Sequence, residues 1–175
     1  MTKKKSVILI LSAMLILLII LLTYYYLIPI LRFCGMFPMP PSYSKCEKIY
    51  SKYESDLNNV ADWLYNSEYE DARIDIFESA SKIEYTLSGK NEWTSEEISD
   101  KAIIESLKTL DKKGFITILK EYNYICFSLY SSLNQGVEIL FSPLGEPDIS
   151  DIYVRSQELK PLKFKSWYYH KVIQK

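Results

Sequence analysis

Residues 115–141 read FITILKEYNYICFSLYSSLNQGVEILF, and the alternation of apolar and polar side chains in this stretch decides the fold class. Ile125, Phe127 and Leu129 fall on one side of an extended chain, and the residues between them fall on the other. A period of two is typical of strands, because successive side chains of a strand point to opposite faces. The predicted strands are 115–120, 122–130 and 136–141.

An apolar stripe with helical spacing lies upstream of these strands and predicts a helix over residues 43–66. Such a stripe packs either on the sheet of its own domain or in a coiled coil between two copies. We favour packing within the chain, because about three heptads are few for a coiled coil and tyrosine is a poor core residue there. The stripe consists of Cys46, Tyr50, Tyr53, Leu57, Val60 and Leu64.

Two more strands and a second helix are predicted between these regions. Residues 72–76 and 83–87 alternate in the manner of strands. Thr94 and Glu97 have the spacing of a capping box, so we expect the second helix to begin at Thr94. We expect it to end at Gly114, because glycine tolerates the positive φ that often follows a helix.

The C-terminal residues complete the predicted sheet. Residues 151–155 read as a short strand, residues 158–164 as a turn or edge segment, and residues 166–173 as a last strand. This order of elements predicts an α+β fold, in which a transmembrane helix precedes a small domain with an antiparallel sheet and two main helices.

The apolar run at residues 7–31 predicts a membrane anchor that is retained. At about 1.5 Å per residue it spans about 37 Å, whereas a bilayer core is about 30 Å thick. It exceeds the apolar region of about 7–15 residues in a signal peptide, and it lacks an Ala-x-Ala cleavage pattern. The excess of lysine before the run predicts a cytoplasmic tail at 1–6 and an extracytoplasmic remainder. The side chains expected at the membrane interface are Lys3, Lys4, Lys5, Tyr24, Tyr25 and Tyr26.

A stalk and one extracytoplasmic domain are expected after the anchor of this single-pass protein. Three prolines stiffen residues 32–42, which we interpret as the stalk, and residues 43–175 form the domain. The domain carries 17 basic and 22 acidic residues, so its net charge of −5 gives no support to nucleic-acid binding. The charge is uneven, since residues 54–105 hold 14 acidic and 4 basic residues.

The sequence predicts no metal or cofactor site and no catalytic residues. His170 is the one histidine of the chain, and we expect it on the surface or on an edge strand. Four carboxylates gather in the segment from Glu68 to Asp75 without a ligand loop, which favours a solvated segment. Cys46 and Cys126 either form a disulfide or remain free thiols, and the sequence leaves both possibilities open.

The strand region is rich in tyrosine and tryptophan, residue types that are favoured at binding surfaces. These side chains either form a binding face or cover the second face of a small sheet. The candidate binding residues are Tyr122, Tyr124, Tyr130, Tyr153, Trp167, Tyr168 and Tyr169.

Two short motifs resemble those of small, single-pass, membrane-anchored bacterial proteins of unassigned function. The first is FSPLGEP at residues 141–147, and the second is WYY at residues 167–169. In that group a tyrosine stands at the position of Phe141. The resemblance implies a bacterial envelope origin and supplies no activity or catalytic residue.

These observations favour a non-catalytic domain that binds a protein or an envelope component on the outer face of the membrane. One alternative is an envelope hydrolase that uses carboxylates, among them those of residues 68–75. Another is an immunity-type protein that neutralises a toxin. The expected partners are the lipid bilayer, through residues 7–31, and an unknown protein or envelope ligand, without nucleic acid. An oligomer is possible but not predicted.

Overall fold

The computed structural model divides the chain into two compact units, Met1–Met39 and Pro40–Lys175. It describes Met14, Ile16, Thr23 and residues 40–76, 78–90, 92–121, 123–132, 135–149 and 154–174. The predicted anchor therefore lies almost wholly outside the described residues, as do Lys3–Lys5 and Tyr24–Tyr26. Among the residues that are described, no helix has the length and apolar character that a membrane span requires.

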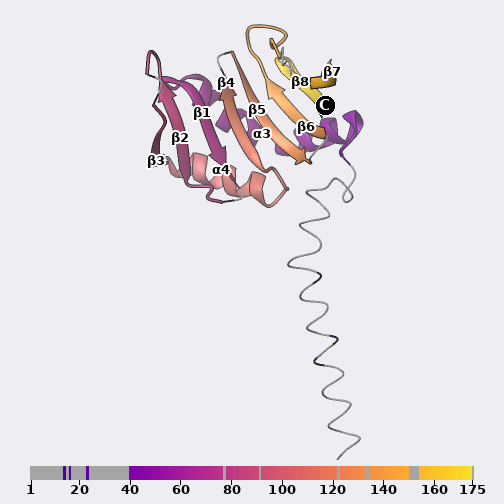
Figure 1. Ribbon diagram of the computed structural model, residues 1–175, viewed down its shortest axis with the longest axis horizontal. Coiled ribbons are helices and arrows are strands. Elements are labelled where there is room, and N and C mark those ends of the chain that lie inside the picture. The colour runs from indigo at the N-terminus through magenta and orange to yellow at the C-terminus, as the bar shows by residue number, and fades with distance from the viewer. Residues whose placement is uncertain are drawn as a thin grey trace, which may run out of the picture. The chain divides into compact units, whose positions relative to one another are not determined.

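The second unit is an α+β domain of two helices and one antiparallel sheet of eight strands, which confirms the predicted fold class of this domain. The sheet order is β3-β2-β1-β4-β5-β6-β8-β7, and Figure 1 shows α3 crossing behind the sheet. The elements are α3 (Tyr43–Tyr65), β1 (Tyr69–Asp75), β2 (Lys82–Leu87), β3 (Thr94–Glu97), α4 (Lys101–Asp111), β4 (Thr117–Glu121), β5 (Tyr124–Ser131), β6 (Gln135–Phe141), β7 (Val154–Pro161) and β8 (Trp167–Gln174).

Helix α3 packs on the sheet of its own chain, as the apolar stripe predicts. Five of the six stripe residues are buried, and the sixth, Tyr53, is half-buried. Tyr53 has non-helical backbone angles (φ −119°, ψ 20°), so the helix is kinked there. The buried face joins side chains of β1, β4, β5, β6 and β8 in one core. The stripe is therefore occupied within the chain, where a coiled coil would need it free.

The predicted start of the second helix is wrong. Thr94 and Glu97 lie in β3, an exposed edge strand that pairs with β2. Helix α4 begins at Lys101, and the side chain of Asp100 caps it by accepting hydrogen bonds from the backbone N–H groups of Ala102 (2.8 Å) and Ile103 (3.3 Å). Asp caps a helix as well as Thr does, so a cap at Asp100 is no worse than one at Thr94. The backbone of residues 94–97 pairs with β2 instead and is therefore extended. The end of the helix near Gly114, which has φ +87°, agrees with the sequence.

The strand alternation is confirmed over most of the sheet. Ile125 and Phe127 are buried, as are Trp167 and Tyr169 on β8, and all four belong to the core that α3 covers. A register shift between Ser128 and Tyr130 interrupts the alternation in β5. At the C-terminal end, residues 154–155 of the predicted short strand and 158–161 of the predicted turn or edge segment belong to the edge strand β7, and residues 162–164 lie in the turn before β8. Residues 151–153 lie outside the described part of the chain.

Lys120 ties the C-terminal end of α3 to the sheet. Its buried ammonium group donates hydrogen bonds to the carbonyl oxygens of Leu64 (2.7 Å) and Ser67 (3.3 Å) and to the Ser67 hydroxyl (3.2 Å). The last carbonyls of a helix lack intrahelical partners and carry partial negative charge, so a cation is favourable there. Burial lowers the pKa of Lys120, and Asp71 opposes that shift.

Candidate functional site

A groove of about 560 Å³ lies between the first turns of α3 and the turn that joins β7 to β8. We call it the lysine groove. Its volume falls within the range of about 300–1,000 Å³ that is usual for ligand pockets. The residues that line it are Ser44, Glu47, Lys48, Ser51, Lys52, Lys163 and Phe164.

The helical side of the lysine groove follows from spacing on α3. Ser44, Lys48 and Lys52 recur at steps of four residues, so they share one face of the helix. All three are exposed, whereas the opposite face carries the buried stripe. The groove thus uses the polar face of the same helix that supplies the core.

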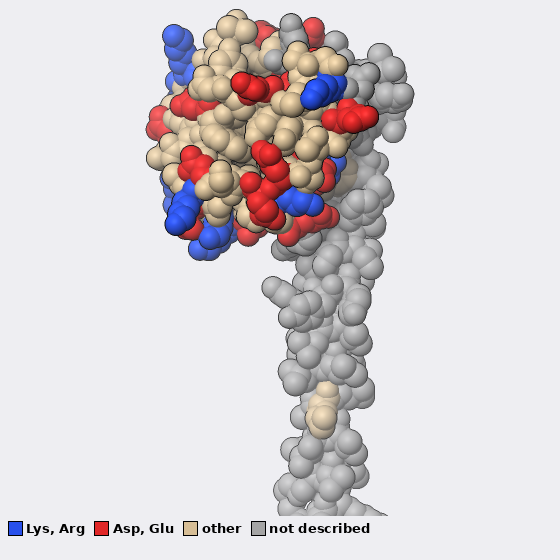
Figure 2. All heavy atoms as spheres, turned by 90° about the vertical axis from the view of Figure 1, so that its left-hand side faces the viewer, with Lys and Arg blue, Asp and Glu red and all other residues tan. Residues whose placement is uncertain are grey.

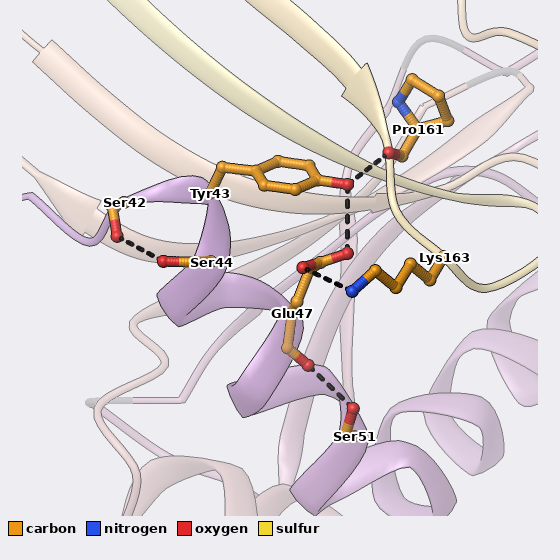
Figure 3. Close-up of polar contacts among 7 residues, drawn as sticks. All are labelled: Ser42, Tyr43, Ser44, Glu47, Ser51, Pro161 and Lys163. Carbon is orange, nitrogen blue, oxygen red and sulfur yellow. Dashed lines mark hydrogen bonds and ion pairs between the residues drawn. The ribbon is translucent and has the colours of Figure 1, made fainter.

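Glu47 is the one carboxylate among the groove residues, and its neighbours hold it in place (Figure 3). The Tyr43 hydroxyl lies 3.1 Å from Glu47 Oε1 and 2.9 Å from the carbonyl oxygen of Pro161. The ammonium of Lys163 lies 3.7 Å from Glu47 Oε2, and the Glu47 side chain is 15% exposed. These contacts connect the first turn of α3 to the end of β7 and fix the position of the carboxylate.

Aromatic rings support the groove from below. The ring centroids of Phe164 and Tyr50 are 4.3 Å apart. The ring centroids of Tyr50 and Trp167 are 4.8 Å apart. Asn58 Oδ1 accepts hydrogen bonds from both the Trp167 indole (3.2 Å) and the Tyr50 hydroxyl (3.4 Å). Tyr169 similarly contacts Tyr43 edge-on at 5.7 Å. The groove is therefore built on a fixed aromatic base.

The turn that presents Lys163 and Phe164 is closed by backbone hydrogen bonds. The Leu162 N–H donates to the Trp167 carbonyl (2.8 Å), and the Trp167 N–H donates to the Phe164 carbonyl (3.2 Å). Ser166 adopts φ 70°, a left-handed conformation that is costly for a residue with a Cβ. The conformation of the turn is thus set by its hairpin closure and not by a glycine.

Charge is distributed unevenly over the domain. Three lysines and one engaged carboxylate give the lysine groove a net charge of +2. The side of the domain that carries β3 is different, because Asp and Glu predominate over Lys and Arg on the face seen in Figure 2. Most of residues 54–105, which hold the acidic excess, lie in elements other than the first turns of α3 that line the groove.

A second polar cluster lies on the sheet face opposite α3. His170 Nδ1 lies 2.8 Å from Glu138 Oε2, and the Ser128 hydroxyl donates to Glu138 Oε1 (3.3 Å). His170 is 6% exposed on a strand that lies between β6 and β7, so the expectation of a surface or edge-strand histidine is wrong. Among the described residues, its buried Nε2 atom has no hydrogen-bond partner. The pairing with Glu138, which sequence spacing does not reveal, makes the burial possible.

This cluster lacks the arrangement of a nucleophilic enzyme. Glu138 lies between Ser128 and His170, whereas catalysis by serine needs the imidazole next to the hydroxyl. Cys126 is also on this face, and burial raises the pKa of its thiol, so it is not a ready thiolate. Cys46 lies on the buried face of α3, where burial raises the pKa of its thiol to about 12. Both cysteines are free thiols, not a disulfide.

The aromatic residues singled out in the sequence do not gather on one exposed face. Tyr130, Trp167 and Tyr169 are buried in the core, and the latter two support the lysine groove. Tyr124 and Tyr168 are half-buried on the sheet face opposite α3. Tyr122 and Tyr153 lie outside the described residues.

Of the four carboxylates in the acidic segment, Asp75 at the end of β1 borders a space of about 50 Å³, which is too small for a sugar ring. Asp75 accepts hydrogen bonds from Arg73 (2.8 Å) and Thr117 (3.0 Å), and Glu70 accepts one from the Gly89 N–H (3.3 Å). Within the described ranges, no three His, Cys, Asp or Glu side chains form a group that could hold a metal ion. The carboxylates of this segment therefore serve local contacts.

Comparison of the chain with protein-family models, with curated proteins and with solved structures gives no match.

Proposed function

We propose that the chain is a membrane-anchored, extracytoplasmic, non-catalytic protein that binds an anionic component of the cell envelope in the lysine groove. The observation that carries the proposal is the groove itself, in which Lys48, Lys52 and Lys163 surround a ligand-sized space with an aromatic base. Lysine ammonium groups bind phosphate as compact point charges with three donors each. The anchored, outward-facing topology is supported by the apolar run at 7–31 and the lysines before it.

The groove favours binding over hydrolysis. Hydrolysis of a glycosidic bond by the usual route needs two carboxylates that flank the bond. Glu47 is the one carboxylate that borders the groove, and it is already engaged by Tyr43 and Lys163. The lysines are placed to attract an anion, and the described lining holds no second carboxylate beside Glu47, which fits a binding site.

The test is binding of soluble phosphates to the purified full chain. The probes are inorganic phosphate, glycerol 3-phosphate and a poly(glycerol phosphate) chain, with titration calorimetry as the readout. We expect the triple variant Lys48→Gln, Lys52→Gln, Lys163→Gln to lose binding, because it removes the three ammonium groups that line the groove and can donate to a phosphate. The matched control neutralises Lys90, Lys101 and Lys112, which are also exposed but lie outside the groove. Equal losses in both triple variants would show that net charge, and not the groove, binds the ligand.

A further inference from the structure

The position of the lysine groove in the chain identifies the source of its ligand. We infer that the groove binds the phosphate headgroup of an anionic phospholipid in the same membrane that holds the anchor. This inference rests on the proposed function and names its ligand.

The tether between the predicted anchor and the groove is short. Residues 32–42 connect the predicted anchor to α3, and 11 residues extend at most about 36–40 Å. The groove begins at Ser44, the second residue of α3, and its helical side ends at Lys52. At about 1.5 Å per residue, these nine residues occupy about 13 Å along the helix. The groove is thus formed by the part of the domain that follows the tether directly, and it is within reach of the lipid headgroups.

The side chains that line the groove match the chemistry of a phospholipid headgroup. Lys48 and Lys52 are exposed cations for phosphate oxygens, although the Lys52 ammonium lies 5.7 Å from the centroid of the Tyr53 ring and exchanges that contact for the ligand. The Ser51 hydroxyl donates to the Glu47 carbonyl oxygen (3.0 Å) and is already engaged. The half-buried ring of Phe164 supplies apolar surface beside them, as the glycerol and upper acyl region of a lipid requires. A bare inorganic anion makes no use of that ring.

The side of the domain that carries β3 has the opposite charge to the lysine groove. The side that carries β3 is acidic, as Figure 2 shows, and an anionic bilayer repels it. Repulsion at that side and attraction at the lysine groove both turn the groove toward the membrane. This attraction acts over about 10 Å at moderate salt, so the short tether is needed to bring the groove within range.

The experiment uses the full chain in nanodiscs, with the acylation rate of each lysine measured by mass spectrometry. The discs contain phosphatidylcholine alone or phosphatidylcholine with phosphatidylglycerol. We expect Lys48, Lys52 and Lys163 to react about fivefold more slowly in the anionic discs. Lys90 and Lys112 lie outside the groove and serve as controls. We expect their acylation rates to be the same in both kinds of disc. A second preparation, Lys163→Gln, is expected to restore much of the reactivity of the two remaining groove lysines.

Soluble phosphates separate the possible sources of the ligand. Glycerol 3-phosphate or poly(glycerol phosphate) is added to discs of phosphatidylcholine alone. Protection by the soluble probes without protection by phosphatidylglycerol overturns the lipid inference and leaves the proposed function standing. Protection by neither overturns both. Equal slowing of the groove and control lysines overturns the inference as well, because it indicates attraction without a specific groove.

Discussion

The cap of α4 gives a sharp test of the fold at the point where sequence and structure disagree. Replacement of Asp100 by Ala removes one oxygen that accepts two backbone hydrogen bonds, of 2.8 Å and 3.3 Å. Loss of an N-cap costs about 0.5–2 kcal/mol, and loss of a negative charge at a helix N-terminus costs about 0.3–1 kcal/mol. We therefore expect Asp100→Ala to lower the free energy of unfolding by about 1.5–2 kcal/mol, which corresponds to a fall in Tm of about 5 °C.

Two further variants make the comparison decisive. Asp100→Asn keeps an oxygen acceptor and loses only the charge, so we expect a loss of about 0.5 kcal/mol. Thr94→Ala changes an exposed position of edge strand β3 and should cost less than about 0.5 kcal/mol. The assay is thermal unfolding of the full chain in detergent, followed by circular dichroism. A larger loss for Thr94→Ala than for Asp100→Ala would place the helix start at the capping box and refute the structure there.

Three other changes have expected outcomes. Ser166→Gly should stabilise the domain by about 0.5–1 kcal/mol, since glycine adopts φ 70° without strain, and a lower Tm would contradict this. Burial and a hydrogen bond to Glu96 raise the pKa of Tyr69 to about 12 from 10.0, so its contribution to stability is present below pH 10 and is lost as the pH rises toward 12. Tyr69→Phe should make the decline of Tm over that interval shallower, and an unchanged slope would exclude Tyr69 as a cause. Glu138→Ala leaves the buried ring of His170 without its hydrogen-bond partner and should cost about 1–3 kcal/mol, whereas Glu138→Gln keeps a hydrogen-bonding group and should cost less in urea unfolding. Equal losses of unfolding free energy in the two Glu138 variants would show that the hydrogen bond to His170 does not stabilise the domain.

Periodicity predicts the elements of this domain because burial imposes it. The stripe of α3 has the spacing of a helix face, and the structure buries that face. The alternation of residues 115–141 predicts strands for the same reason, since one side of each strand meets the core. Capping is different, because Thr94 and Asp100 are both acceptable caps and the choice depends on whether residues 94–97 pair with β2. Such pairing is a tertiary interaction that local spacing does not reveal.

The candidate site could be predicted only in part, because its two sides are far apart in the chain. The helical side had a readable signal, since Ser44, Lys48 and Lys52 recur every four residues on the polar face of α3. Nothing local relates these residues to Lys163. The two sides meet because Tyr43 bonds to Pro161, 118 residues away, and because Phe164 packs on the Tyr50 ring.

The alternation of β8 predicts a strand, but it does not tell which of its aromatic side chains are buried. Trp167 and Tyr169 share one face and Tyr168 shares the other with His170, as a period of two requires. The period does not say which face a helix covers, and here α3 covers Trp167 and Tyr169. Covered rings cannot touch a ligand, but they fix the positions of Tyr50 and Tyr43, which hold Phe164 and Glu47 at the groove. Two of the aromatic side chains that suggested a binding face, Trp167 and Tyr169, are therefore the support of the lysine groove, and the side chains exposed at the groove are lysines.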